Sequence, residues 1–157
     1  MKRLLTALSV FVFVVSIAGF GHAQSDPRIG TWKLNVAKSK SDAPARKSET
    51  RTYTSSGDMI SMQTDVVNND GSKQSYGYKI KPDGKDYPYT GTGPGGATTI
   101  AEKHMGQGFM AEQKKDGKLL FTAMVDLSDD GKQMTITVKG MDAMGKSANA
   151  VRVYDKQ

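Results

Sequence analysis

The sequence predicts an all-β domain in which successive antiparallel strands form an up-and-down meander. Turn dipeptides recur along the chain, and the segments between them alternate between apolar and polar residues. Asp-Gly and Asn-Gly pairs suit the positive-φ positions of tight hairpin turns. The turns are spaced by about eight to ten residues, as in an all-β sandwich or barrel. They fall at Ser56-Gly57-Asp58, Asn69-Asp70-Gly71, Pro82-Asp83-Gly84, Asp116-Gly117, Asp129-Asp130-Gly131 and Met144-Gly145.

The N-terminal segment has the three-part layout of a secretory signal peptide. Lys2 and Arg3 precede an apolar run over residues 4–20, and small residues follow at Gly21 and Ala23. We expect cleavage after Ala23, so that residues 1–23 are the signal and 24–157 form a single domain. A retained anchor is the alternative, because 17 apolar residues are slightly fewer than the ~20 that span a bilayer.

Charge and cysteine content exclude several classes of protein. Residues 24–157 carry 20 basic and 16 acidic residues, a net charge of +4. The lysines are scattered rather than gathered in a stripe, which excludes a nucleic-acid-binding protein. The absence of cysteine excludes a disulfide framework. No second stretch is apolar enough for stable membrane insertion after cleavage, so we expect a periplasmic or secreted protein.

Ten segments are predicted strands. Little helix is expected beyond one turn before Pro44, within residues 35–48, and a short turn opened by Asp26-Pro27 before the first strand. A meander of this length tends to close, because closure removes exposed strand edges. We therefore expect a closed or nearly closed barrel of about eight to ten strands; an open half-barrel and a two-sheet sandwich are the alternatives. The strands are predicted over 29–34, 49–55, 58–66, 73–80, 86–90, 97–103, 107–114, 118–127, 132–140 and 147–155.

Strand alternation predicts which side chains face the interior. In segment 118–127 the odd-numbered positions are apolar from Leu119 to Leu127. In the last strand the same reasoning places Val151 and Val153 inside and Arg152 outside. The other inward sets are Met134, Ile136 and Val138, and Tyr76, Tyr78 and Ile80.

Several stretches of this sequence carry a family resemblance: GTWKLNVAKSK (30–40), DGKDYPYTG (83–91), KKDGK (114–118), DDGKQMTITVKGMDAMGK (129–146) and VRVYDKQ (151–157). They resemble a family of small secreted bacterial proteins of uncharacterised function that are described as lipocalin-like. The resemblance covers nearly all of residues 24–157 and implies a lipocalin-like β-barrel.

Gly30-Thr31-Trp32 is similar to the G-x-W motif that opens the first strand of lipocalins. The resemblance implies that Trp32 closes one end of the barrel beside a basic residue of the last strand. Arg152 is the candidate for that residue, since a guanidinium can stack on an indole. Gly30, Trp32 and Arg152 are thus the expected structural residues.

Catalytic and metal-binding patterns are missing from the sequence. His104 is the only histidine after residue 23, and no nucleophile motif surrounds a serine. The acidic run at Asp126, Asp129 and Asp130 lacks EF-hand spacing, and Met141 and Met144 are a weak hint of Cu(I) binding in a chain rich in core-filling methionines. We expect no catalytic residues, metal or cofactor.

The stretch Gly91–Gly96 spells a dinucleotide-binding fingerprint, but its context is wrong. Pro94 lies inside the motif, and the β-branched residues that follow favour a strand where the fingerprint needs a helix. The stretch is therefore predicted to be a loop at a barrel mouth.

An exported barrel without catalytic residues favours a binding function. We expect a carrier or sensor of a small apolar or amphipathic ligand held in the barrel interior. The alternative is an envelope interaction protein with a packed core, whose loops at 38–47 and 91–96 bind a protein of unknown identity. The expected ligand-binding residues are Tyr53, Tyr76, Tyr78, Phe109, Phe121 and Met134.

Overall fold

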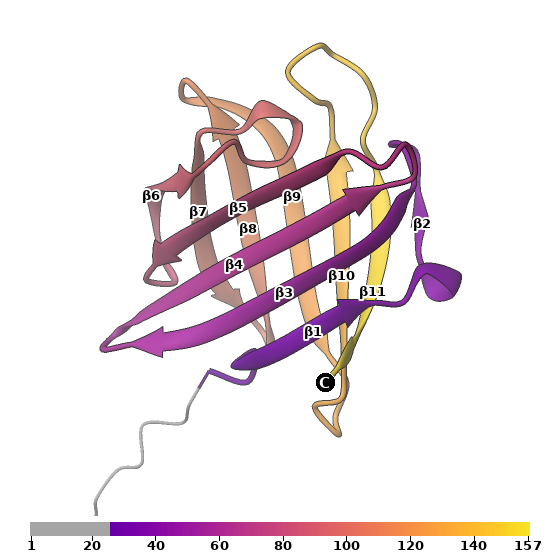
Figure 1. The fold of residues 1–157 in the computed structure, drawn as a ribbon. Coiled ribbons are helices and arrows are strands. Elements are labelled where there is room, and N and C mark those ends of the chain that lie inside the picture. The colour runs from indigo at the N-terminus through magenta and orange to yellow at the C-terminus, as the bar shows by residue number, and fades with distance from the viewer. Residues whose placement is uncertain (1–25) are drawn as a thin grey trace, which may run out of the picture.

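The computed structural model describes residues 26–157, which form an antiparallel β-barrel (Figure 1). Each strand of the barrel pairs with its neighbours in the chain, and β1 also pairs with β11, so that β1 and β3 to β11 close a ring. The short strand β2 lies outside the ring and pairs with β11. The predicted meander is therefore confirmed as a closed barrel of ten strands. The predicted signal peptide lies outside the described residues.

Two 3-10 turns accompany the strands: η1 (Val36–Lys38) and η2 (Pro94–Gly96). None of the helical segments within residues 26–157 is long and apolar enough to cross a membrane. The strands are β1 (Gly30–Leu34), β2 (Lys40–Ser41), β3 (Arg46–Ser56), β4 (Met59–Asn68), β5 (Lys73–Ile80), β6 (Asp83–Thr90), β7 (Thr99–Met105), β8 (Gly108–Lys115), β9 (Lys118–Leu127), β10 (Gln133–Gly140) and β11 (Ala150–Lys156).

Most hairpins form where the turn dipeptides stand in the sequence, but Asp83-Gly84 lie inside β6, and the turn between β7 and β8 at Gly106 was not predicted. Between β8 and β9, both Asp116 (φ 48°) and Gly117 (φ 78°) have positive φ. Positive φ at both central residues matches the right-handed twist of the flanking strands, which is why Asp-Gly is favoured there. All ten predicted strands are present, whereas β2 was not predicted.

Two β-bulges change which side chains face the interior. The register of β3 against β4 shifts between Arg46 and Ser48, which leaves Lys47 as the extra residue and turns Arg46 toward the interior. The register of β8 against β9 shifts at Gln113 and Lys114. The prediction that Leu119 shares the inner face of β9 is wrong, because this second bulge leaves its side chain 51% exposed.

In the last strand, β11, the side chains that face the interior are the opposite set to the predicted one. Arg152 lines the interior and Tyr154 is fully buried, whereas Val151 lies outside. Val153 is buried on the outer face, where the chain after β1 covers it. The backbone N–H of Asn35 donates to the carbonyl oxygen of Val153 (2.8 Å), and the hydroxyl of Ser39 accepts from the N–H of Val153 (3.0 Å). An apolar residue can therefore be buried on either face of this strand.

Candidate functional site

The barrel encloses a cavity of about 620 Å³. It opens at the end of the barrel that the loops at 43–46, 68–72, 94–95 and 142–148 surround. A volume of this size falls within the range of small-molecule sites, about 300–1,000 Å³. Much of the wall is apolar and comes from the middle strands: Met62, Ile100, Ala111, Phe121, Ala123, Val125, Ile136 and Val138.

Four of the six predicted ligand-binding residues line this cavity: Tyr53, Tyr76, Tyr78 and Phe121. The other two are buried elsewhere in the core. Phe109 lies under the side chain of Arg28 near the closed end of the barrel, and Met134 is fully buried on β10. The inward faces were thus predicted well, but burial alone does not separate cavity-lining residues from core residues.

Three tyrosines form an edge-to-face cluster on one wall of the cavity. The ring centroids of Tyr76 and Tyr89 are 5.9 Å apart, as are those of Tyr78 and Tyr89. Such perpendicular contacts are the favoured geometry for aromatic pairs. Burial raises the pKa of Tyr78 and Tyr89, so these phenols stay neutral and keep their hydroxyl protons.

An ion-pair cluster lies on β3 near the mouth of the cavity. The carboxylate of Glu49 is fully buried and accepts from Arg51 Nε (2.7 Å) through one oxygen and from Arg46 through the other. Burial alone would raise the pKa of Glu49, but Arg51 and Arg46 lower it to about 2. Glu49 is therefore ionised at neutral pH and neutralises one of the two guanidinium groups that it contacts.

Arg152 adds a third guanidinium to this cluster without a further carboxylate. Its side chain makes no hydrogen bond or ion pair with any residue between 26 and 157, although it lines the same cavity. Burial and the nearby charge of Arg46 lower the pKa of Arg152. The three arginines and the one carboxylate of Glu49 leave a net charge of +2 at this end of the cavity. This charge favours the binding of a negative group there.

Neutral polar groups without partners lie in the same interior. The hydroxyls of Tyr76 and Tyr154 and the Oε1 atom of Gln113 are buried and have no hydrogen-bond partner among the described residues. A buried polar group without a partner costs about 1–3 kcal/mol, so native proteins rarely leave several together. Tyr76 and Gln113 line the cavity with Arg152. A bound molecule could accept a hydrogen bond from the hydroxyl of Tyr76 or donate one to Gln113 Oε1.

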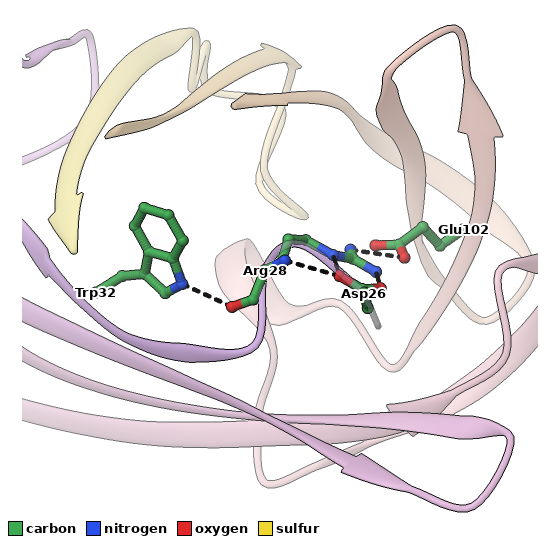
Figure 2. Close-up of polar contacts among 4 residues, drawn as sticks. All are labelled: Asp26, Arg28, Trp32 and Glu102. Carbon is green, nitrogen blue, oxygen red and sulfur yellow. Dashed lines mark hydrogen bonds and ion pairs between the residues drawn. The ribbon is translucent and has the colours of Figure 1, made fainter. Parts of the chain in front are cut away.

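The opposite end of the barrel is closed by the residues that precede β1 (Figure 2). The fully buried side chain of Arg28 donates to Asp26 Oδ2 and to Glu102 Oε1, each at 2.7 Å. Its guanidinium carbon lies 3.5 Å from the ring centroid of Phe109 on β8. Arg28 thus links the chain before β1 with β7 and β8 across this end of the barrel.

Trp32 completes the closed end, as the G-x-W resemblance implied, but with different partners. Its indole Nε1 donates to the carbonyl oxygen of Arg28 (2.7 Å). The cation over its ring is Lys156, with Nζ 5.1 Å from the centroid, so the predicted pairing with Arg152 is wrong. Gly30 has φ 126°, a backbone conformation that favours glycine, and an added Cβ would lie 3.1 Å from Cε of the flexible Lys156 side chain.

Glu102 is the acidic group at the closed end of the cavity. Burial raises the pKa of Glu102, and Arg28 only partly opposes this shift. The cavity thus has a positive region beside its mouth and an acidic group at its base. An elongated ligand with its negative group at Arg152 and its apolar part deeper in the barrel would fit this distribution.

The Gly91–Gly96 stretch is a loop at the mouth, as predicted. It forms η2, and Pro94 and Gly95 line the cavity. A Cβ on Gly95 would lie 2.4 Å from the ring of Phe121, so the close approach of this loop to the wall requires glycine. No helix follows the loop in the described chain, and it therefore lacks the N-terminus on which a dinucleotide phosphate would bind.

The other candidate ligating residues do not come together. No group of three His, Cys, Asp or Glu side chains in residues 26–157 is placed to hold a metal ion. His104 stacks on Phe109 with ring centroids 4.7 Å apart. Glu49 and Glu102 are held by different arginines, and Glu112 pairs with Lys114.

Sequence reasoning missed the arginine cluster, although a signal for it was present. In β3 the residues Glu49, Arg51 and Tyr53 alternate with Thr50, Thr52 and Thr54, and the first set is buried. Alternation showed that each set shares a face, but polarity did not show which face is inside. The large tyrosine and arginine side chains were the better indicator of the inner face, because the interior of a barrel that holds a ligand has room for them.

The fold is similar to that of solved β-barrel structures. Fatty-acid-binding protein 1 of Echinococcus granulosus has a TM-score of 0.58 and 14% identity, over 83% of this chain and 97% of that chain. The ileal bile acid-binding protein of zebrafish, in complex with cholic acid, has a TM-score of 0.54 and 12% identity, over 84% and 100%. No family model matches the sequence, and no curated protein is significantly similar to it. The likeness shows a shared fold.

Proposed function

We propose that this protein is an exported, non-catalytic binding protein that carries or senses a small amphipathic molecule with a negatively charged group. The observation that carries the proposal is the position of Arg152, which lines the cavity without a partner among residues 26–157. The hydroxyl of Tyr76 lines the same cavity and also lacks a partner there. A carboxylate or similar group there would accept charge-assisted hydrogen bonds and balance the excess positive charge. The apolar wall would hold the remainder of the molecule.

The fold neighbours support the class of ligand. One is a fatty-acid-binding protein and the other a bile acid-binding protein, and both names describe molecules with an apolar body and an acidic group. The signal-like N-terminus supports export to the periplasm or the medium, and with it a carrier or sensor role. The alternative of a loop-binding protein with a packed core is less well supported, because the interior is open over about 620 Å³.

The test compares an anionic amphiphile with its neutral ester. Hexadecanoate and methyl hexadecanoate are titrated against a fluorescent amphiphile bound in the cavity, with native protein and with Arg152→Gln. We expect native protein to prefer the carboxylate, and Arg152→Gln to bind it about 10- to 100-fold more weakly, the range for loss of a charged hydrogen bond. Binding of the ester should change little.

A matched variant removes the same charge outside the cavity. Lys33→Gln on the exposed face of β1 should bind both probes as native protein does. Arg152→Gln should also be at least as stable as native protein, because the barrel disfavours the charge of Arg152. Equal affinity of native protein for acid and ester, or no affinity for either, would contradict the proposal.

A further inference from the structure

An exposed apolar patch lies beside the mouth of the cavity. Met144 is 88% exposed, Met141 58% and Leu119 51%; we call these three residues the rim patch. Met141 and Leu119 line one surface groove, which Ala143 and Gly145 continue toward Met144. Large apolar side chains are seldom grouped in water without a partner, so this patch points to a surface that is covered in use.

The loop that carries two of these methionines is a small hairpin that extends beyond the strand ends (Figure 1). A bridge between Met141 and Ser147 forms its base, and Met144 lies near its tip. The carboxylate of Asp142 accepts from the backbone N–H groups of Met144 and Lys146, both at 2.9 Å. These bonds define the loop and hold Met144 outward.

Lysines surround the rim patch. Lys115, Lys118 and Lys139 line the same groove, and Lys146 lies on the loop. All four are exposed, and none forms an ion pair within the described part of the chain. The acidic residues of the groove are Asp116 and Asp142, so the four lysines leave a local charge of +2.

The opposite end of the barrel lacks this combination. Met105, 43% exposed, is the large exposed apolar residue on its turns within residues 26–157. Asp58 and Lys81 pair with one another there, and Lys132 follows the acidic residues Asp129 and Asp130. Among residues 26–157, the mouth end groups three large exposed apolar side chains with four unpaired lysines, whereas Met105 at the other end has one unpaired lysine, Lys103, beside it.

We propose that the mouth end docks on the surface of an anionic lipid bilayer. The rim patch would enter the head-group region, and the four lysines would contact lipid phosphates. Apolar side chains next to basic ones are the pattern of proteins that lie on anionic membranes. A protein partner fits less well, because lysine is depleted in the centres of protein interfaces.

Docking in this orientation would place the mouth of the cavity against the bilayer. Asp142 lines both the groove and the cavity, and the N–H of Ala143 donates to the carbonyl oxygen of Gly95 at the mouth (3.1 Å). An amphipathic ligand could then pass between bilayer and cavity without crossing water. This last step rests on the proposed function, whereas the docking surface does not.

A fluorescent label at the tip of the loop tests the docking directly. The chain has no cysteine, so Met144→Cys accepts a single environment-sensitive label. We expect its emission to shift to shorter wavelength with vesicles of phosphatidylglycerol and phosphatidylcholine, but not with phosphatidylcholine alone. Met105→Cys, labelled at the opposite end, should not shift. This local readout distinguishes loop contact from attachment through residues 4–20.

Charge variants test the lysines. Lys115→Gln with Lys118→Gln should weaken binding to the anionic vesicles about thirtyfold, the loss expected for two surface lysines. Lys132→Gln at the other end should have no effect. Equal shifts of the two labels, or no shift at position 144, would overturn the proposal, as would a shift that requires an added protein. Loss of hexadecanoate binding in solution, with docking retained, would count against the proposed function alone.

Discussion

At the scale of single residues, charge inside the barrel is the decisive feature. Glu49 accepts hydrogen bonds from Arg46 and Arg51, and Arg152 stands beside them without a carboxylate of its own in the described chain. A buried ion pair adds little stability by itself, but removal of one partner leaves a buried charge uncompensated. Glu49 therefore has a structural role, whereas Arg152 is available to a ligand.

Replacement of this carboxylate should destabilise the barrel. Glu49→Gln leaves three guanidinium groups without a negative charge, and we expect the free energy of unfolding at pH 7 to fall by about 3–5 kcal/mol. Urea unfolding followed by tryptophan fluorescence measures the change. Glu112→Gln removes a carboxylate from a partly exposed pair with Lys114 and should lower stability by less than about 1 kcal/mol.

The same variant should change the pH dependence of stability. The pKa of Glu49 is about 2 in the folded protein against an ordinary 4.5, so the unfolded chain takes up this proton at higher pH than the folded one. The stabilisation is fully present above pH 4.5 and is lost as the pH falls toward 2, a loss of the order of 3 kcal/mol. Glu49→Gln should lack this loss, and parallel curves for the two proteins would contradict this role.

At the scale of elements, the turns were predictable and the facing of some strands was not. Asp-Gly pairs have a local conformational preference that needs no tertiary information, and each predicted strand overlaps the observed one. The facing of Leu119 depends on a bulge between β8 and β9, which no local pattern showed. The prediction that Val151 faces inward and Arg152 outward was wrong because it assumed an apolar interior, whereas this interior contains charged groups.

Gly140 is the glycine at the junction of β10 with the loop that begins at Met141. It has φ 144°, and an added Cβ would lie 2.0 Å from the carbonyl oxygen of Leu120. Gly140→Ala should lower the free energy of unfolding by about 3 kcal/mol or more, because both the backbone conformation and the neighbouring strand must change. Urea unfolding is again the measurement.

Gly131 supplies the matched control for this variant. It also has positive φ (65°), in the turn between β9 and β10, but a Cβ added there would have no neighbouring atom within 4 Å among the described residues. Gly131→Ala should therefore show only the strain of a left-handed alanine, about 1–2 kcal/mol. Equal losses for the two variants would show that contact with Leu120 is not the cause.

At the scale of the whole molecule, the ring of strands has one pair of neighbours with few backbone pairings, and its two ends differ. β5 and β6 pair only at Gly77 with Thr90 and Tyr78 with Tyr89. One end is closed by Arg28 and Trp32, and the other opens among loops. Closure of the ring was predictable, because a long meander avoids free edges.

The open interior was not predictable from the same reasoning. Whether a barrel of this size is hollow depends on how its side chains fill the ring. Arg51 and Arg46 line this cavity, and both donate to Glu49. These contacts join residues within β3, whereas the cavity wall also includes Arg152 of β11 and the loops around the mouth, which no local sequence pattern brings together.

A crystal structure of the protein with hexadecanoate tests the central claim most directly. We expect a chain of density inside the barrel, with the carboxylate within hydrogen-bond distance of Arg152 and the tail directed toward Ile100 and Glu102. An interior filled by side chains, or a carboxylate bound away from Arg152, would contradict it.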